Sequence, residues 1–376
     1  MKPNNPFLIA GYYGPAYFCD RDRETDVMLA AINNGRNVTL ISPRRMGKTG
    51  LINHCYHILH QVDPKVVTIY IDIFHTQDLA DFVRVFANSV IGVLDTAPQK
   101  DIERIAQFIR SCRPSLTFDE NTGQPKISVD FVNDKAEHTL KEIFEYLGSY
   151  EGRCCIAFDE LQQIREYPES GVEALLRSYI QFAHNTHFIF SGSSQHLMED
   201  IFLSPKRPFY QSTQIMGLES IPMDMYYEFA AFRFSQNGRL LPKETFEYIY
   251  NKYEGHTWYV QYVMNRLYDT SGELSLSAAD FAIRRILEEN AYVYERVLSG
   301  YTSGCVRLMR AIACEGKVKE ILSGDFIRRY DLKAASSVSS MLKKLQDNEL
   351  VYHCPEGYSI YDRFMSEWMK VTFRAK

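Results

Sequence analysis

CxxC motifs, long apolar runs and a strong excess of charge are all missing from this sequence. Its eight cysteines form no CxxC pair and show no regular spacing, which disfavours both a zinc site and a disulfide framework. No run of about 18 apolar residues occurs, and prolines and glycines interrupt the N-terminal segment where a secretion signal needs an unbroken apolar stretch. We therefore expect a cytoplasmic protein with reduced thiols that is neither secreted nor membrane-spanning.

The charge balance disfavours a uniformly basic surface. The 376 residues carry a net charge of -5, and 45% of them are hydrophobic, which is enough for a large core divided over two or three domains. Residues 301–376 hold 13 Lys and Arg against 9 Asp and Glu, so the basic character is at the C-terminal end. Any contact with nucleic acid must therefore come from a local patch.

The hydrophobic pattern near the N-terminus predicts alternating helices and strands. Apolar residues at helical spacing predict a helix over 22–33, and a short apolar strand follows over 37–41. A tight loop then leads to a helix over 48–61 and to a strand rich in β-branched residues over 66–74. Strand, loop, helix and strand in this order form a βαβ unit, which implies a parallel sheet.

An insertion at about 77–132 interrupts this α/β pattern. Residues 77–112 predict two helices, and residues 115–131 predict a hairpin. The elements expected after the insertion are a helix near 135–147, a strand at 154–158, a helix near 172–184 and a strand at 187–191. We therefore expect an α/β core over residues 1–222.

Beyond residue 222 strands disappear and the pattern becomes helical. Aromatic residues recur at helical spacing up to about residue 300, and we expect them to pack a helical domain over 223–300. In 301–376 the predicted elements are helices near 304–314, 323–330 and 334–347, followed by strands at 350–354 and 358–361. Three helices followed by a two-stranded hairpin is the order of a winged helix.

The loop between the first strand and its helix has the composition of a phosphate-binding loop. Gly47 would let the main chain approach the β-phosphate, Lys48 would reach the β and γ oxygens, and the Thr49 hydroxyl would bind Mg²⁺. Ser42 occupies the place where this kind of loop usually has its first glycine. The alternative interpretation of the segment is a basic loop that binds no nucleotide. The residues expected to bind ATP or ADP are Ser42, Pro43, Arg44, Arg45, Met46, Gly47, Lys48, Thr49 and Gly50.

An apolar strand that ends in two carboxylates supplies the second expected element. Asp159 and Glu160 follow residues 154–158, at the carboxyl edge of the expected sheet. We assign Asp159 to the magnesium shell, and Glu160 to orienting and deprotonating the water that attacks the γ-phosphorus. The alternative is a solvated acidic pair, but the phosphate loop earlier in the chain favours the catalytic interpretation.

The strand at 187–191 ends in small polar residues. Because it is expected beside the strand of Asp159, a hydroxyl at its end could hydrogen-bond the attacking water or the γ-phosphate. Ser191 and Ser193 are the candidates, and an ordinary turn is the alternative.

These motifs together resemble the STAND-type AAA+ ATPases, in the group often described as archaeal-type ATPases. The resemblance covers nearly the whole chain and rests on Phe18-Cys19-Asp20-Arg21 with Glu24, Pro43 to Thr49, Asp159-Glu160, Gly192-Ser193-Ser194, Gly255-His256 and the C-terminal winged helix. It implies a P-loop NTPase core of the AAA+ kind, a helical lid over 223–300 and a winged helix-turn-helix over 301–376. It also implies an ATP-driven switch, with Arg21 counted among the nucleotide-binding residues.

Two places depart from the family pattern. Where the family often has Leu-Tyr-Gly-Arg, residues 208–212 of this chain are Pro-Phe-Tyr-Gln-Ser, so an arginine is missing. Arg207, just upstream, is the candidate substitute as a γ-phosphate sensor, and a salt-bridged or solvated arginine is the alternative. The lid motif at 255–258 is Gly-His-Thr-Trp, with threonine where the family prefers proline.

The leading functional hypothesis is a slow, Mg²⁺-dependent ATPase that acts as a nucleotide-controlled switch and signals to a protein partner. A ring-forming motor is a second possibility, although it needs a dependable arginine finger. The third is a DNA-binding protein, similar to origin-recognition ATPases, in which ATP is a structural or regulatory ligand. No membrane contact is expected.

The winged helix bears on the third hypothesis. In the expected recognition helix, 334–347, Lys343 and Lys344 could contact phosphates, and Arg328 and Arg329 lie just before it. Leu342 and Leu345 are expected to face the core. Winged helices also dock proteins, so DNA and protein both remain candidate partners.

Overall fold

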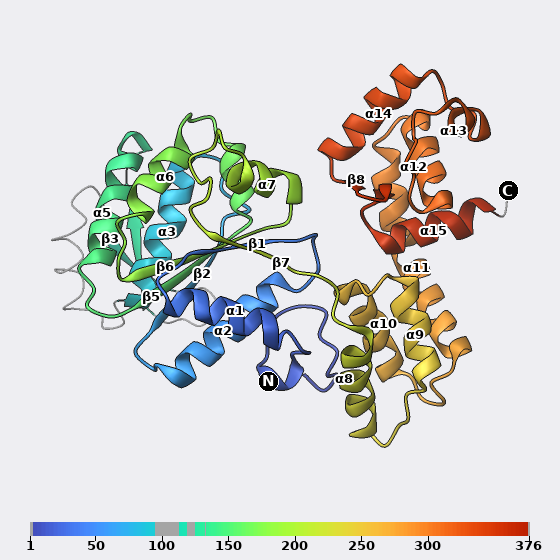
Figure 1. The fold of residues 1–376 in the computed structure, drawn as a ribbon, viewed down its shortest axis with the longest axis horizontal. Coiled ribbons are helices and arrows are strands. Elements are labelled where there is room, and N and C mark those ends of the chain that lie inside the picture. Colours follow the sequence, from blue (N-terminus) through green and yellow to red (C-terminus); the bar gives the residue numbers. More distant parts are fainter. Residues whose placement is uncertain (1–2, 95–112, 119–124, 132, 375–376) are drawn as a thin grey trace. The chain divides into compact units, whose positions relative to one another are not determined.

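The chain is divided between an α/β unit and a helical unit (Figure 1). The α/β unit contains Ala10–Ile221, whereas the helical unit contains Pro3–Ile9 together with Pro222–Lys376. The chain therefore passes between the units twice. The computed structural model describes residues 3–94, 113–118, 125–131 and 133–374. None of the helices in these ranges has the length and apolarity needed to cross a membrane.

A five-stranded parallel sheet forms the centre of the α/β unit. Its strands are β1 (Val38–Ile41), β2 (Val67–Asp72), β5 (Cys154–Asp159), β6 (Thr186–Gly192) and β7 (Gln214–Gly217). Their order in space is β2-β5-β6-β1-β7, and every neighbouring pair is parallel. The predicted parallel α/β core is confirmed, and β7 at the sheet edge is an additional strand. Because β6 lies between β1 and β5, its end lies between the ends of those two strands.

Helices cover both faces of this sheet (Figure 1). They are α1 (Asp22–Asn33), α2 (Lys48–Val62), α3 (Leu79–Leu94), α5 (Ala136–Gly148), α6 (Val172–Ile180) and α7 (Gln195–Leu203). Successive residues of a strand point to opposite faces. In β5, Ile156 and Phe158 pack with α3, α5 and α6, while Cys155 and Ala157 pack with α1 and α2. Burial on both faces explains why this strand is an unbroken apolar run.

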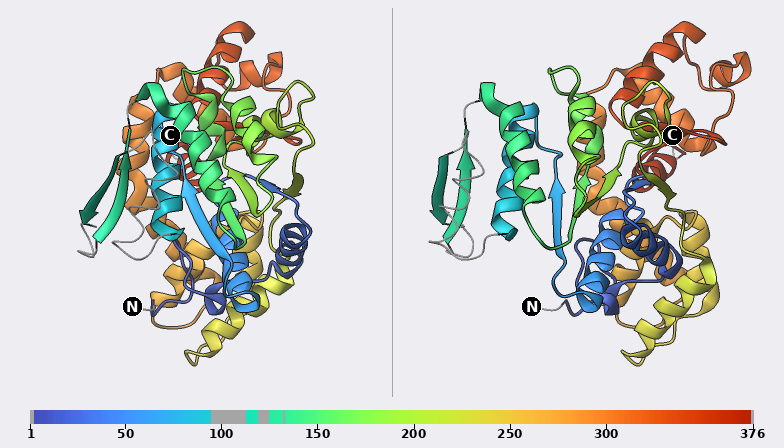
Figure 2. Two further views of the ribbon diagram at one scale, coloured as in Figure 1. Left: turned by 90° about the vertical axis from the view of Figure 1, so that its left-hand side faces the viewer. Right: turned by 60° about the vertical axis from the view of Figure 1, so that its left-hand side comes forward.

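The predicted insertion contains a β-hairpin. Strands β3 (Arg113–Phe118) and β4 (Pro125–Asp130) pair antiparallel, and β4 lies beside α3 (Figure 2). Of the two helices predicted for 77–112, α3 is present. The region of the second helix, beyond residue 94, lies outside the described residues, as does the turn of the hairpin.

The helical unit ends in a winged helix, as the sequence predicts. Its first helices are α8 (Met223–Ser235), α9 (Lys243–Lys252), α10 (Thr257–Asp269) and α11 (Leu276–Ser299). The winged helix follows with α12 (Ser303–Glu315), α13 (Gly324–Arg329), α14 (Ala335–Asp347), β8 (Val351–Cys354) and β9 (Gly357–Ile360). A last helix, α15 (Arg363–Arg374), packs against α11 and α12 and was not predicted. Its buried residues, Phe364, Met365, Trp368 and Met369, have helical spacing.

The segment Pro3–Ile9 is bound into the helical unit. The Phe7 ring is fully buried against Phe234 and Tyr268, with ring centroids 5.2 and 5.8 Å away. The Asn265 amide donates to the Phe7 carbonyl at 2.7 Å, and the Trp258 indole donates to the Ile9 carbonyl at 3.0 Å. This unit is therefore built from two stretches of chain that lie far apart in the sequence.

Candidate functional site

The loop between β1 and α2 contains two residues in the left-handed backbone region. Arg45 has a φ of 65° and Gly47 a φ of 95°, a conformation that favours glycine. Nothing lies within 4 Å of the point where a side chain at Gly47 would begin. Ser42 has no positive φ, so its side chain is accommodated without backbone strain in place of the usual glycine.

The N-terminus of α2 is suited to an anion. Gly47 precedes the helix at the N-cap position. Because glycine has no side chain, it cannot cap the first amide groups of α2. Such amides, together with the positive end of the helix dipole, form a binding site for phosphate groups. The donors present thus fit the phosphate chain of a nucleotide.

Lys48 is the cation of this loop and is 7% exposed. Its Nζ donates to the carbonyls of Ser42 at 2.9 Å and Pro43 at 3.0 Å, so the ammonium group caps its own loop. Burial lowers the pKa of Lys48 to about 8, although the negative charges of Asp159 and Glu160 oppose the shift. An anion bound in the loop would favour the charged form of this lysine.

Asp159 ends β5 and lies opposite the start of α2. The Thr49 hydroxyl donates to Asp159 Oδ2 at 3.2 Å, and the backbone N–H of Glu160 donates to Oδ1 at 3.0 Å. The hydroxyl of Tyr70, on β2, also donates to Oδ2. A hydroxyl and a carboxylate are the oxygen ligands that Mg²⁺ prefers, and Mg²⁺ completes its shell with waters and phosphate oxygens. Thr49 and Asp159 therefore fit a magnesium ion.

Glu160 is turned toward β6. Its Oε2 accepts hydrogen bonds from the Ser193 hydroxyl at 2.6 Å, from the Ser193 backbone N–H at 3.2 Å and from Gln162 Nε2. Arg44 Nε, from the loop, donates to the Ser193 hydroxyl oxygen at 2.9 Å. Ser191, the other serine considered, has a fully buried hydroxyl for which no hydrogen-bond partner is present among the described residues.

A continuous set of hydrogen bonds therefore joins several of the predicted residues. It runs from Thr49 through Asp159 and Glu160 to Ser193 and Arg44. Tyr70 and Gln162 also belong to this set and were not predicted from the sequence. Neither residue lies in a recognisable motif, and only the pairing of β2 with β5 and the turn after Glu160 bring them to the site.

Arg21 and Gly50 contribute to the site through packing of the protein itself. Arg21 is 4% exposed, forms an ion pair with Glu24 at 2.7 Å and donates to the Met46 carbonyl at 3.4 Å. A side chain at Gly50 would begin 3.3 Å from the Phe18 ring. Both residues thus hold the loop and the first turn of α2 against the segment that precedes α1.

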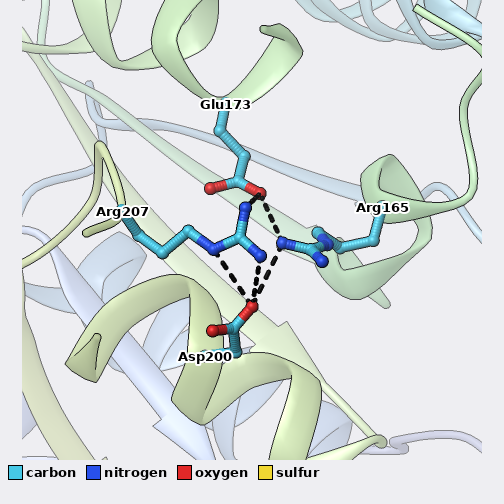
Figure 3. Close-up of polar contacts among 4 residues, drawn as sticks. All are labelled: Arg165, Glu173, Asp200 and Arg207. Carbon is cyan, nitrogen blue, oxygen red and sulfur yellow. Dashed lines mark hydrogen bonds and ion pairs between the residues drawn. The ribbon is translucent and has the colours of Figure 1, made fainter. Parts of the chain in front are cut away.

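Arg207 belongs to a four-residue ion-pair cluster (Figure 3). Its Nε donates to Asp200 Oδ2 at 3.0 Å, and its Nη1 lies 3.5 Å from Glu173 Oε1. Arg165 contacts the same two carboxylates, at 3.1 and 3.3 Å. Burial raises the pKa of Glu173, although Arg165 opposes the shift. The guanidinium of Arg207 is therefore already occupied by two carboxylates.

Helix α14 presents basic side chains on the winged helix. Val338, Leu342 and Leu345 are buried, as predicted for the two leucines, whereas Lys343 and Lys344 are exposed. The two arginines before this helix form ion pairs: Arg328 with Asp325, and Arg329 with Glu315. Lys343 and Lys344 are exposed and form no ion pair in the part of the chain that the structure describes, although the Lys344 ammonium lies 5.4 Å from the centroid of the Tyr301 ring.

Comparison with known proteins agrees with this geometry. Residues 18–263 match a family described as an ATPase domain predominantly from Archaea, and residues 292–371 match a probable winged helix domain. No curated protein sequence matches the chain. The first match covers more than half of the sequence.

Several solved structures share the fold over nearly the whole chain. A Walker-type ATPase of Pyrococcus abyssi has a TM-score of 0.66 at 16% identity, covering 97% of this chain and 99% of its own. The ORC2 protein of Aeropyrum pernix, solved as ADPNP-ADP complexes, has a TM-score of 0.57 at 13% identity and covers 100% and 99%. The ORC1 protein of the same organism, in complex with DNA, has a TM-score of 0.55 at 12% identity and covers 99% and 97%.

Proposed function

The chain belongs to the family of ATPase domains found predominantly in Archaea, and from this we propose that it binds Mg²⁺-ATP at residues 42–49 and hydrolyses it slowly as a nucleotide-controlled switch. The observation that carries the proposal is the hydrogen-bonded set from Thr49 through Asp159 and Glu160 to Ser193. It combines a hydroxyl and a carboxylate for a metal with a second carboxylate for water, beside a loop of amide donors.

Each residue of the site has a distinct role in this mechanism. The loop amides and Lys48 bind the phosphate chain, and Lys48 exchanges its two carbonyl partners for phosphate oxygens. Thr49 and Asp159 would hold Mg²⁺, which neutralises charge on the phosphates when bound. Glu160 orients a water molecule and accepts its proton. Ser193 and Gln162 fix the direction of the Glu160 carboxylate.

The switch hypothesis extends this mechanism to the helical unit, in the manner of a STAND-type ATPase. Its support is the division of the chain into two compact units, which meet in the sequence at Ile9 to Ala10 and at Ile221 to Pro222, because movement between compact units is the usual basis of such switches. A protein partner would then recognise one nucleotide state. Limited proteolysis without nucleotide, with ADP and with a non-hydrolysable ATP analogue tests the switch, and identical cleavage patterns would indicate a rigid scaffold.

Calorimetric titration with ADP and with the ATP analogue tests the binding site itself. We expect Lys48→Ala to weaken binding at least about 10-fold, because it removes a charge-assisted contact to phosphate oxygens. Lys65→Ala is the matched control, since Lys65 is an exposed lysine of the same unit and is not part of this set. Equal affinities for wild type and Lys48→Ala would refute the assignment of the loop.

A second candidate function is DNA binding through the winged helix. The exposed Lys343 and Lys344 on α14 favour it, and the ORC1 protein that shares this fold was solved with DNA. Phosphate contacts make binding weaken with salt. Retention on duplex DNA at increasing salt, with and without ATP, should therefore be lost in Lys343→Gln/Lys344→Gln. Equal retention of the variant would show that these two lysines do not carry the contact, whereas a wild-type protein that is not retained would favour a protein partner for this domain.

A further inference from the structure

Tyr70 occupies an unexpected position next to the candidate magnesium ligands. It lies on β2, where it is paired in register with Ala157 of β5, two residues before Asp159. Its hydroxyl donates to Asp159 Oδ2, the same oxygen that accepts the Thr49 hydroxyl. The Tyr70 and Thr49 hydroxyl oxygens are 3.4 Å apart. Tyr70 thus closes a triangle with the two residues that fit a metal.

The contact satisfies a buried charge. Asp159 is 7% exposed, and a buried carboxylate is costly unless its oxygens accept hydrogen bonds. Tyr70 and Thr49 supply two donors to Oδ2, and the Glu160 amide supplies one to Oδ1. Tyr70 is partly buried, and the phenol is a donor as long as it keeps its proton.

A magnesium ion bound to Asp159 Oδ2 cannot share that oxygen with both hydroxyls. Mg²⁺ requires oxygen ligands at about 2.1 Å in near-octahedral geometry. A carboxylate oxygen has two lone pairs, and the hydroxyls of Thr49 and Tyr70 both donate to Asp159 Oδ2. A metal bound directly to Oδ2 must therefore displace one of these two donors, and Thr49 is itself expected to bind the metal. When the metal arrives, either the Tyr70 hydroxyl leaves Oδ2 or the metal cannot bind there.

We propose that Tyr70 is an internal competitor for Mg²⁺: its hydrogen bond to Asp159 and metal binding at Asp159 exclude each other. This inference rests on the proposed function and defines its regulation. The hydroxyl keeps Asp159 oriented and satisfied in the nucleotide-free protein, and it raises the magnesium concentration at which the site closes around Mg²⁺-nucleotide. Metal binding is thereby coupled to a movement of a side chain on β2.

The test removes only the hydroxyl, with Tyr70→Phe. Binding of ADP is followed by calorimetry at increasing Mg²⁺, and the half-maximal Mg²⁺ concentration is compared with that of the wild type. Loss of one competing hydrogen bond to a carboxylate should lower this concentration about 3- to 10-fold. Affinity for ADP in the presence of a chelator should not change, because Tyr70 has no place in the phosphate loop.

Tyr56→Phe is the matched control. Tyr56 is a buried tyrosine of α2 whose hydroxyl donates to the carbonyl of Ile69, the residue next to Tyr70, at 3.0 Å. Both variants should lower the melting temperature of the nucleotide-free protein. Only Tyr70→Phe should regain wild-type stability when saturated with Mg²⁺-ADP, because the lost bond is absent in that state.

The outcomes separate the two proposals. A wild-type protein that binds no nucleotide overturns the proposed function and the competitor role together. Mg²⁺-dependent binding that is unchanged in Tyr70→Phe overturns only the competitor role. A higher Mg²⁺ requirement in Tyr70→Phe also overturns it, since it would mean that the hydroxyl supports the metal shell.

Discussion

Glu160 and Ser193 share two hydrogen bonds, in which both the hydroxyl and the backbone N–H of Ser193 donate to the same carboxylate oxygen of Glu160. Glu160 itself has a φ of 57°, a left-handed conformation that is uncommon for a residue with a side chain. A strained backbone at a residue whose carboxylate is held by three donors indicates that the direction of this side chain is specified.

We expect Glu160→Gln to retain ATP affinity and to lose turnover. Glutamine can still accept a hydrogen bond from Ser193 through its carbonyl oxygen, but it cannot deprotonate water. Loss of a general base typically lowers the rate about 100- to 10,000-fold. Phosphate release measures the rate and calorimetry the affinity. Wild-type turnover in this variant would show that Glu160 is not the base.

Ser193→Ala provides a graded comparison at the same contact. It removes the hydroxyl but leaves the backbone donor, so Glu160 should be less well oriented yet chemically intact. We expect turnover to fall about 10-fold or less, with unchanged ATP affinity. A loss as large as that of Glu160→Gln would instead indicate that the Ser193 hydroxyl itself contacts the reacting groups.

The lowered pKa of Lys48 makes ATP binding dependent on pH. In the free protein the Lys48 ammonium loses its proton near pH 8, because burial disfavours the charged form. Phosphate groups favour the charged form, so the pKa must rise when nucleotide binds. Above about pH 8, binding therefore takes up a proton, and affinity should fall as pH rises. Below that pH the lysine is already charged, and affinity should be nearly constant.

Calorimetry from pH 7 to 9, in buffers of different ionisation enthalpy, measures both the affinity and the proton uptake. The terminal phosphate is already ionised in this range, so it adds little to the change. Lys48→Arg is the control, since a guanidinium stays protonated and its affinity profile should be flat. If the wild-type protein takes up no proton when it binds nucleotide at pH 9, Lys48 is not the titrating group.

A feature of the site could be predicted when its residues are close together in the sequence, and could not when they are far apart. The strand that ends at Asp159 and the loop that contains Lys48 can be recognised from consecutive residues, because the residues next to them in the sequence determine the strand, the turn and the helix. Tyr70 reaches Asp159 only because β2 and β5 pair in one particular register. A shift of that register by one residue would turn Tyr70 to the other face of the sheet, and no local pattern specifies the register.

The arginine cluster and the N-terminal segment were unpredictable for the same reason. Arg207 finds Glu173 and Asp200 on two different helices, α6 and α7. Phe7 packs against helices that begin more than two hundred residues later in the chain. A single sequence shows the apolar and charged character of these residues but not their partners.

Arg207→Ala is expected to affect stability and not nucleotide binding. It leaves the buried Glu173 and the partly exposed Asp200 with Arg165 as their remaining partner in the cluster, so the loss should be about 1 to 3 kcal/mol. Urea unfolding measures the stability, and calorimetry compares ATP analogue with ADP. A γ-phosphate sensor would behave differently, since its removal weakens binding of the ATP analogue while leaving ADP affinity unchanged.

The N-terminal segment should be required for the stability of the helical unit. Phe7 is fully buried, and its ring lies 5.2 Å from Phe234 and 6.2 Å from Phe229. Truncating a buried phenylalanine typically costs about 3 to 5 kcal/mol, because apolar contacts are lost and a cavity remains.

Ile9→Ala is the matched control, because Ile9 belongs to the same segment but is 42% exposed, and its truncation should cost less than about 0.5 kcal/mol. Both tryptophans of the protein, Trp258 and Trp368, lie in the helical unit, so their fluorescence during urea unfolding reports on that unit alone. Phe7→Ala should therefore shift the fluorescence transition to lower urea while Ile9→Ala leaves it in place, and equal transitions for Phe7→Ala and wild type would mean that the segment does not stabilise the unit.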